Sequence, residues 1–330
     1  MARTFPSRAR SSRSPRPPRP PRSSPFARRA WAVRLALAWL ALLGAAHAAP
    51  PPAAGDDGDG DGQEPTEPAK PPPQRARVRV PERDGMLLIP GGRFPMGTNN
   101  PKTPNERPQR VVTVGAFWLD RTEVTVGAYR ACVDAKRCER PQRRSATCTY
   151  DLGDPELPVS CVRWSDADTY CKSVNKRLPA EAEWEFAARG PEGWGYPWGT
   201  RYPDCKLANT LLRENSGRTC HTRPWPVGSA PANASKYGVL DLSGNVQEWT
   251  ADWYTERLGS LAPLSGASHT LRGGGWLSTP NQSRAAARDW ASALEAGPNV
   301  GFRCARDAQR PAPPARPGSA GKPPASRKEH

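Results

Sequence analysis

The chain has 330 residues and a formal net charge of +16, from 48 Lys and Arg against 32 Asp and Glu. Ten of the arginines and no acidic residue fall in residues 1–48, so the remainder carries 38 basic and 32 acidic residues, a net charge of +6. This excess forms no basic stripe interleaved with aromatic residues, and we therefore expect a solvated surface and no binding to nucleic acid.

The first 48 residues have the pattern of a secretion signal. Residues 1–29 are mostly Pro, Arg, Ser and Ala, and an apolar run of twelve residues, 35–46, follows. A transmembrane helix needs about 20 residues, so this run is too short to span a bilayer. It matches the hydrophobic part of a signal peptide, with cleavage after Ala48. We expect a periplasmic or secreted protein with no membrane span after cleavage.

Two further segments have too little apolar content for a core. Residues 49–84 form a linker rich in Pro, Ala, Gly and Asp, and residues 307–330 form a Pro-rich tail; we expect both to be disordered. In the linker, Asp57, Asp59 and Asp61 imitate an EF-hand loop, but Pro68 stands where a bidentate Glu is needed. We interpret this stretch as an acidic spacer.

Residues 85–306 are therefore expected to form one compact domain. Its predicted elements are short and separated by turns. Few helices, scattered strands and long loops predict an irregular α+β fold. Strands are predicted at residues 86–89, 111–120, 159–164 and 270–276.

Three helices are predicted from their end signals. Thr125 is the expected N-cap of residues 126–134, and Ser165 that of residues 166–174, with Asp168 in an approximate capping box. Pro179 opens the third helix, which Gly190 ends.

Eight cysteines all follow the predicted signal peptide. An even number in an exported chain indicates a disulfide framework. The absence of any Cys-x-x-Cys pair excludes zinc ribbons and thioredoxin-like redox motifs. The eight are Cys132, Cys138, Cys148, Cys161, Cys171, Cys205, Cys220 and Cys304.

Seven sequence motifs together carry a specific resemblance to a known family. In their order and spacing they resemble the sulfatase-modifying factor family, which contains the formylglycine-generating enzymes. The resemblance covers residues 86–306 and implies an irregular α+β fold related to C-type lectins. The motifs are MLLIPGGRFPMGT (86–98), FWLDRTEVTVGAYRACV (117–133), LPVSCVRWSDADTYCKSVNKRLPAEAEWEFAARG (157–190), YPWG (196–199), YGVLDLSGNVQEWTADWY (237–254), LRGGGWLS (271–278) and NVGFRCAR (299–306).

The resemblance also implies a reaction whose residues are missing here. The family's enzymes bind Cu(I) through two cysteines five residues apart and use oxygen to convert a sulfatase cysteine into formylglycine. Cu(I) needs soft thiolate ligands, but the corresponding residues are Ser278 and Ser283. Gly275 and Gln247 replace a serine and a tryptophan of the same oxygen pocket. We therefore expect no copper and no oxidase activity of this kind.

An enzyme with a non-standard site is the alternative. It would be an oxidoreductase that oxidises a cysteine or another sulfur group with O2. Related sulfoxide synthases hold iron with three histidines, but only His221 and His269 lie in the predicted domain. A site of two histidines and one carboxylate stays open, yet we expect no iron because lone histidines are mostly surface or core residues. Ser278 and Ser283 lack the motif of a hydrolytic nucleophile.

The resemblance implies a structural Ca²⁺ at a turn, held by two carboxylates and two carbonyls. A capped turn without metal is the alternative. A second family site would use Asn209 and the carbonyl of Thr210, but the stretch near Cys220 offers no carboxylate, so we expect its loss. The ligands of the first site would be Asp241, Glu248 and the carbonyls of Gly244 and Val246.

Disulfides and a groove complete the resemblance. It implies a Cys171–Cys304 disulfide, and we expect a Cys205–Cys220 bridge, while the other four cysteines can pair in three ways. Trp276, Arg288 and Arg303 match positions near the family's groove, although the arginines could instead pair with buried carboxylates. Five further tryptophans could line a peptide groove, but we expect most to fill the core. They are Trp164, Trp184, Trp198, Trp249 and Trp253.

The sequence thus predicts a pseudoenzyme of the cell envelope. We expect a monomeric, disulfide- and calcium-stabilised domain that binds a peptide or protein, such as a sulfatase or another envelope protein. A carbohydrate-binding module rests on fold analogy alone.

Overall fold

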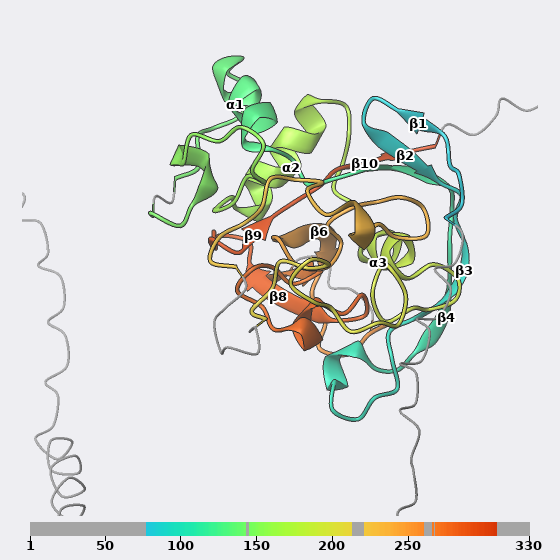
Figure 1. Ribbon diagram of the computed structural model, residues 1–330. Coiled ribbons are helices and arrows are strands. Elements are labelled where there is room, and N and C mark those ends of the chain that lie inside the picture. The colour runs from blue at the N-terminus through green and yellow to red at the C-terminus, as the bar shows by residue number, and fades with distance from the viewer. Residues whose placement is uncertain (1–76, 143–144, 213–220, 261–265, 267, 309–330) are drawn as a thin grey trace, which may run out of the picture. The chain divides into compact units, whose positions relative to one another are not determined.

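The computed structural model describes residues 77–142, 145–212, 221–260, 266 and 268–308 (Figure 1). The predicted signal peptide, residues 49–76 of the predicted linker and residues 309–330 of the predicted tail lie outside this range. Within it the elements are short, since no helix exceeds ten residues and no strand exceeds seven. This mixture of short elements and ordered loops confirms the predicted irregular α+β fold.

The strands of the described residues form three sheets. Their orders are β1-β2-β5-β10, β3-β4 and β8-β7-β6-β9. Neighbouring strands are antiparallel except β6 and β9, which are parallel. The strands are β1 (Glu82–Arg83), β2 (Met86–Ile89), β3 (Gly92–Met96), β4 (Arg110–Val114), β5 (Phe117–Asp120), β6 (Gln247–Trp253), β7 (Ser268–Arg272), β8 (Arg288–Ser292), β9 (Val300–Gly301) and β10 (Ala305–Asp307).

The ordered domain is slightly longer than predicted at both ends. Strand β1 lies in the predicted linker and pairs with β2 through the turn Asp84-Gly85. Both turn residues have positive φ, 53° and 70°, which matches the twist of a two-residue hairpin. Strand β10 extends the domain to Asp307.

All three helices have the predicted boundaries to within two residues. Helix α1 (Val126–Asp134) is capped by Thr125, whose side chain accepts a hydrogen bond from the N–H of Ala128 (3.1 Å). Helix α3 (Glu181–Arg189) ends at Gly190, which has a φ of +63°. The described part also holds four 3-10 helices: η2 (Pro104–Glu106), η3 (Thr149–Asp151), η4 (Pro231–Asn233) and η5 (Pro280–Ser283).

The predicted N-cap of the second helix is wrong. Helix α2 spans Trp164–Ser173 and its N-cap is Arg163. The carboxylate of Asp166 accepts a hydrogen bond from the N–H of Arg163 (3.0 Å), so Asp166 and not Asp168 caps this end. Ser165 is an exposed residue inside the first turn.

The strand predictions differ from the structure where tertiary contacts intervene. Residues 111–120 split into β4 and β5, which belong to different sheets. Residues 159–164 form no strand: Cys161 has a φ of +62° and is joined to Cys148, which takes the chain out of an extended path. Strand β7 ends before Gly273 and Gly274, whose φ angles are +85° and +61°.

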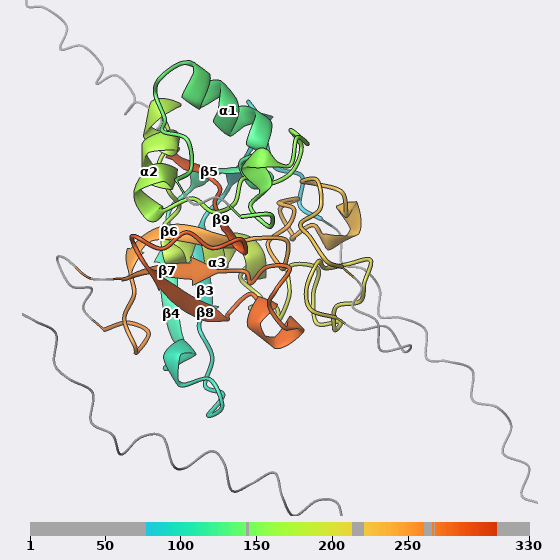
Figure 2. The same cartoon turned by 90° about the vertical axis from the view of Figure 1, so that its left-hand side faces the viewer.

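Two apolar clusters fill the interior. One joins α1 and α2 to the third sheet, and the other surrounds α3. Helix α3 contacts both the β3-β4 ribbon and strands β6 and β7, and it lies near the centre of the domain in both views (Figures 1 and 2). Trp184 and Trp249 are fully buried, whereas Trp164, Trp198 and Trp253 are half-buried.

Disulfides connect distant parts of the described chain. Cys171–Cys304 joins α2 to the residue before β10, as the resemblance implies, and Cys132–Cys138 and Cys148–Cys161 settle the pairing that the sequence left open. Cys205 is also disulfide-bonded, while its predicted partner Cys220 lies outside the described residues. In the described ranges, no helix is long and apolar enough to cross a bilayer.

Candidate functional site

The loop after β7 carries the first of the two serines that stand at the thiol positions. Gly273 and Gly274 turn the chain back, and Ser278 follows at 7% exposure. Its Oγ accepts hydrogen bonds from the N–H of Gly275 (3.0 Å) and from Nδ2 of Asn299 (3.2 Å). Ser278 therefore stabilises the loop in which it lies.

The second serine also forms a hydrogen bond within the loop. Ser283 is fully buried at the end of η5, and its Oγ donates a hydrogen bond to the carbonyl of Thr279 (3.2 Å). A Cβ added at Gly274 would lie 2.6 Å from this hydroxyl, so only glycine fits beside it. A hydrolytic nucleophile requires a general base within hydrogen-bond distance of its hydroxyl. Among the described residues, neither serine hydroxyl has such a contact.

Asn299 occupies the space next to Gly275. A Cβ added at Gly275 would lie 2.3 Å from Oδ1 of Asn299 and 3.0 Å from its carbonyl oxygen. The Asn299 side chain is fixed at both ends, because Oδ1 accepts from the N–H of Leu277 (2.9 Å) and Nδ2 donates to Ser278. The serine that the family has at this position could not be accommodated without moving Asn299.

Gln247, at the position of a family tryptophan, is similarly engaged. It opens β6 and is 6% exposed. Its Nε2 donates to a carboxylate oxygen of Asp289 on β8 (2.9 Å), and its N–H donates to the carbonyl of Asn299 (2.7 Å). Gln247 therefore links strand β6 to β8 and to the same asparagine.

The predicted groove residues are buried. Trp276 is 7% exposed and donates through Nε1 to the carbonyl of Pro298 (3.1 Å). Arg288 forms two hydrogen bonds to the carboxylate of Glu181 on α3 (2.5 and 3.0 Å), with its side chain 1% exposed. Of the two alternatives for this arginine, the structure shows the buried ion pair.

Arg303 also forms a buried ion pair, in which both carboxylate oxygens take part. Its guanidinium is fully buried and binds both carboxylate oxygens of Glu248, each at 2.7 Å. Burial opposes the charge, but the negative charge of Glu248 outweighs it and raises the pKa of Arg303. Such bidentate pairs are strong and directional, so Arg303 holds β6 and is not presented to a ligand.

A buried ion network lies between α3 and the β7-β8 pair. Arg272, with no exposure, contacts Glu185 and lies 3.6 Å from Glu181, while Glu185 also pairs with Arg189 (2.7 Å). Breaking one member of a buried pair leaves an uncompensated charge. The network therefore fixes α3 against the sheet at the base of the serine loop, the loop of residues 273–283 that carries Ser278 and Ser283.

The first predicted calcium site does not fit a cation. Both carboxylate oxygens of Glu248 accept from Arg303, and one also accepts from Nε1 of Trp184 (2.8 Å). The oxygens of Asp241 accept from Nδ2 of Asn233 (2.9 Å) and the N–H of Gly228 (2.6 Å). All four oxygens of the two predicted carboxylate ligands, Asp241 and Glu248, thus have protein donors. Among the described residues, the unpartnered carboxylate oxygen at this turn is instead Oε2 of Glu123, which is buried.

A third carboxylate faces this group. Glu123 is 2% exposed, and one of its oxygens accepts from Nδ2 of Asn245 (3.1 Å). Burial, and next the negative charge of Asp241, hold the pKa of the Glu123 carboxyl well above its ordinary value. Glu123 lies in the motif FWLDRTEVTVGAYRACV (117–133), but its position beside Asp241 could not be predicted, because these residues are more than a hundred positions apart.

The second predicted calcium site retains one suitable ligand. Oδ1 of Asn209 and Oγ1 of Thr210 are buried and have no hydrogen-bond partner in the described part of the chain. The amide of Asn209 is oriented by its Nδ2, which donates to the carbonyl of Arg223 (2.9 Å). An oriented, unpartnered amide oxygen is a ligand that Ca²⁺ accepts.

The two histidines of the domain occupy different environments. His269 is stacked between Trp164 and Trp253, with ring centroids 3.9 and 3.8 Å away. His221 contacts the carbonyl of Cys205 (2.8 Å) and the ring of Trp225. Within the described residues, no group of three His, Cys, Asp or Glu side chains is arranged to hold a metal ion.

Residues 71–308 match the family described as "Sulfatase-modifying factor enzyme 1-like domain", which is more than half of the chain. The chain belongs to this family. Its relatives include proteins named as formylglycine-generating enzymes and proteins named as inactive ones. "Inactive C-alpha-formylglycine-generating enzyme 2" of Mus musculus is 33% identical over 276 residues, covering 68% of this chain and 87% of that protein. "Formylglycine-generating enzyme" of Streptomyces coelicolor is 30% identical over 286 residues, covering 68% and 90%.

A solved family-like structure supports the fold. PvdO from Pseudomonas aeruginosa superposes with a TM-score of 0.58 at 29% identity, covering 68% of this chain and 94% of PvdO. Similarity to family members named active and inactive is nearly equal, so overall identity does not separate them. Ser278 and Ser283, whose hydroxyls form hydrogen bonds within their own loop, fit the non-catalytic interpretation.

Proposed function

We propose that this chain is an exported member of the family that has lost copper-dependent oxidation and acts as a peptide- or protein-binding or accessory module of the cell envelope. One observation carries the proposal: Ser278 and Ser283 stand at the thiolate positions, and their hydroxyls serve the loop itself. A serine hydroxyl does not replace a thiolate as a Cu(I) ligand. Gly275, which stands at the position of a family serine and packs against Asn299, supports it further.

Export and the partner belong to the same proposal. The predicted signal peptide and the three described disulfides support an oxidising compartment such as the periplasm or the exterior. Because relatives carry the name formylglycine-generating enzyme, the proposed partner is a sulfatase or another envelope protein, bound by a monomer. Cell fractionation of a tagged full chain tests export, and retention in the cytoplasm would contradict it.

The test of lost oxidation combines metal analysis with an activity assay. The purified protein, loaded with Cu(I) or Fe(II), is incubated with a Cys-x-Pro-x-Arg peptide and oxygen, and the peptide mass is followed. We expect no mass change, and saturable peptide binding by fluorescence anisotropy. The Streptomyces coelicolor relative serves as the positive control. Stoichiometric copper or iron together with formylglycine product would overturn the proposal in favour of an oxidoreductase with a non-standard site.

We further propose that structural Ca²⁺, if bound, is held at Asn209 and not at the Asp241–Glu248 turn. The unpartnered Oδ1 of Asn209 supports this assignment. Elemental analysis with and without a chelator, combined with thermal unfolding of Asn209→Ala and Asp241→Asn, tests it. We expect the chelator to lower the unfolding temperature of Asp241→Asn and not that of Asn209→Ala; the reverse pattern would refute it.

A further inference from the structure

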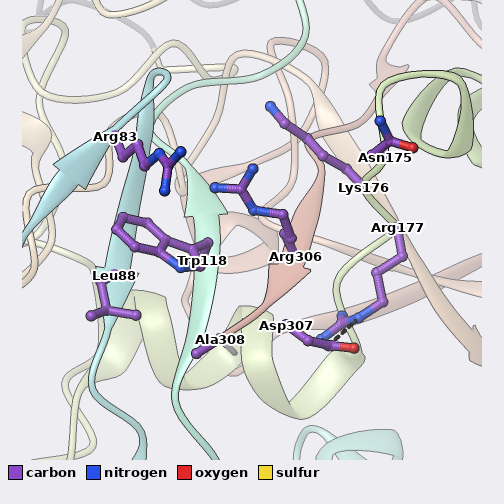
Figure 3. Close-up of a pocket in the computed structure, with 9 residues that line it drawn as sticks. All are labelled: Arg83, Leu88, Trp118, Asn175, Lys176, Arg177, Arg306, Asp307 and Ala308. Carbon is purple, nitrogen blue, oxygen red and sulfur yellow. Dashed lines mark hydrogen bonds and ion pairs between the residues drawn. The ribbon is translucent and has the colours of Figure 1, made fainter. Parts of the chain in front are cut away.

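A pocket lies on the outer face of the β1-β2-β5-β10 sheet, formed by elements other than the serine loop. Its volume is about 640 Å³, within the range of about 300–1,000 Å³ that ligand sites span. Figure 3 shows side chains from β1, β2, β5, β10 and the residues after α2 directed into it. The family's replaced residues do not line it, so the pocket is separate from the degenerate site.

The floor of the pocket is one row of side chains across three strands. Leu88 of β2 and Arg306 of β10 are both paired with Trp118 of β5, so all three lie on the same face of the sheet. The guanidinium carbon of Arg306 lies 5.8 Å from the centroid of the Trp118 ring. An arginine stacked in this way keeps the N–H edge of its guanidinium available to an acceptor.

The side chains that line the pocket carry more positive charge than the neighbouring carboxylates neutralise. Lys176 pairs with Asp120 (2.6 Å), and Arg177 pairs with Glu183 (2.7 Å) and Asp307 (2.6 Å). Those two cations are therefore balanced within the protein.

The remaining two cations are not balanced in this way. Arg83 has a single ion pair, to its neighbour Asp84 (3.4 Å), in which the side chains are 74% and 64% exposed, and such pairs contribute little. Arg306 forms no ion pair within the described part of the chain. Figure 3 shows the guanidinium groups of Arg83 and Arg306 both directed into the space beside Trp118.

The edge of the sheet at this pocket favours an extended ligand. Ala305 of β10 exchanges two backbone hydrogen bonds with Arg177 (2.7 and 2.8 Å) on the outer side of the strand. Asp307 lies two residues further and directs its backbone to the same side, where no described residue pairs with it. A peptide strand could add its backbone here, as in other recognition by strand addition.

We propose that this pocket binds an acidic peptide segment of a partner protein. Arg83 and Arg306 bind its carboxylates, while an apolar side chain of the peptide packs on Leu88 and Trp118. Arginine suits this role because its planar fork matches a carboxylate. The two unbalanced guanidinium groups are the charge complement of two neighbouring acidic residues, which selects against a basic or neutral peptide.

The experiment measures binding of a fluorescein-labelled peptide, Gly-Glu-Phe-Asp-Glu-Gly, to the full chain by anisotropy. The double variant Arg83→Ala/Arg306→Ala is expected to weaken binding by about tenfold or more, since it removes two charge-assisted contacts. Arg201→Ala, at an exposed arginine that pairs only with exposed Asp204, is the matched control and should change affinity by less than about twofold. The amide peptide Gly-Gln-Phe-Asn-Gln-Gly should lose binding to a similar extent.

Each outcome decides the proposal. Equal affinity for the double variant, an equal loss in Arg201→Ala, or unchanged binding of the amide peptide would each overturn it. Preferential binding of a sulfated polysaccharide through the same two arginines would assign the pocket to that ligand and also overturn it. Arg306→Lys keeps the charge but loses the fork, so intermediate affinity with an unchanged unfolding temperature separates loss of contact from loss of fold. The Cys-x-Pro-x-Arg peptide should bind to the double variant and to wild type with equal affinity. The acidic-peptide site and the proposed function of the serine loop can therefore fail independently.

Discussion

Gly275 shows how the absence of one carbon atom shapes the loop that carries Ser278. Its missing Cβ makes room for the Asn299 side chain, which in turn fixes Leu277 and Ser278. Interiors are packed as densely as crystals, so a space of this size is filled by one group or the other. In this chain the space beside Gly275 is taken by Asn299, which belongs to the family-like motif NVGFRCAR (299–306).

Gly275→Ala is expected to destabilise the protein by about 1–3 kcal/mol, because the added methyl group overlaps Asn299. Urea unfolding followed by circular dichroism measures the difference. Gly115→Ala is the matched control, since a Cβ there would meet no atom within 4 Å, and it should be neutral or slightly stabilising. Equal stability of Gly275→Ala and wild type would show that Asn299 moves freely, contrary to its two hydrogen bonds.

His269→Phe is expected to reduce the loss of stability in mild acid. Burial lowers the pKa of His269 below its ordinary value of about 6.5. As the pH falls, His269 of the unfolded chain takes up a proton before His269 of the folded protein does. The stability that neutral His269 provides is therefore fully present above about pH 6.5 and is lost as the pH falls to the lower pKa of the folded state. Phenylalanine keeps a ring between Trp164 and Trp253 but cannot titrate. Unfolding free energies at several pH values between about 7 and 5 test this, and parallel curves for the two proteins would contradict it.

At the scale of the elements, helix ends were predictable where the capping signal is local. Thr125 caps α1 through its own side chain three residues from its partner, and Gly190 ends α3 with a positive φ. The N-cap of α2 was mispredicted because Ser165 lies inside the first turn, while Arg163 is the N-cap and its N–H donates to the carboxylate of Asp166. The indole of Trp164 donates to the carbonyl of Thr250 (2.8 Å), which brings this residue into the first turn.

Thr125→Ala should therefore cost about 1 kcal/mol of stability, as loss of an N-cap usually does. Ser165→Ala, at the wrongly predicted cap, should be within about 0.5 kcal/mol of wild type because Ser165 is an exposed residue inside the helix. Chemical denaturation of both variants gives the comparison. A larger loss for Ser165→Ala than for Thr125→Ala would mean that the boundary of α2 is misplaced.

At the scale of the whole molecule, disulfides and buried ion pairs join segments that are distant in the chain. Cys171–Cys304 closes a separation of 133 residues, whereas Cys132–Cys138 closes only 6. Arg303–Glu248 and Arg288–Glu181 cross between elements in the same way. A domain with such short helices and strands depends on these connections for its shape.

Removing Cys171–Cys304 with two serines should therefore cost more than removing Cys132–Cys138. The loop-entropy relation gives about 5 kcal/mol for the long loop and about 2 kcal/mol for the short one. Unfolding midpoints of the two double variants, measured without reductant, test the order. An equal loss would indicate that local contacts, and not loop closure, govern both.

The sequence alone determined the properties that depend on residue identity and local pattern. These are the family, the absence of thiols at positions 278 and 283, the short elements and the ends of α1 and α3. Only the tertiary structure decided which groups meet: Arg288 and Arg303 face carboxylates, Asn299 fills the space at Gly275, and Arg83 meets Arg306 across a pocket. Partners more than a hundred residues apart leave no periodic trace, because their proximity is set by how the sheets and α3 pack and not by the chain near them.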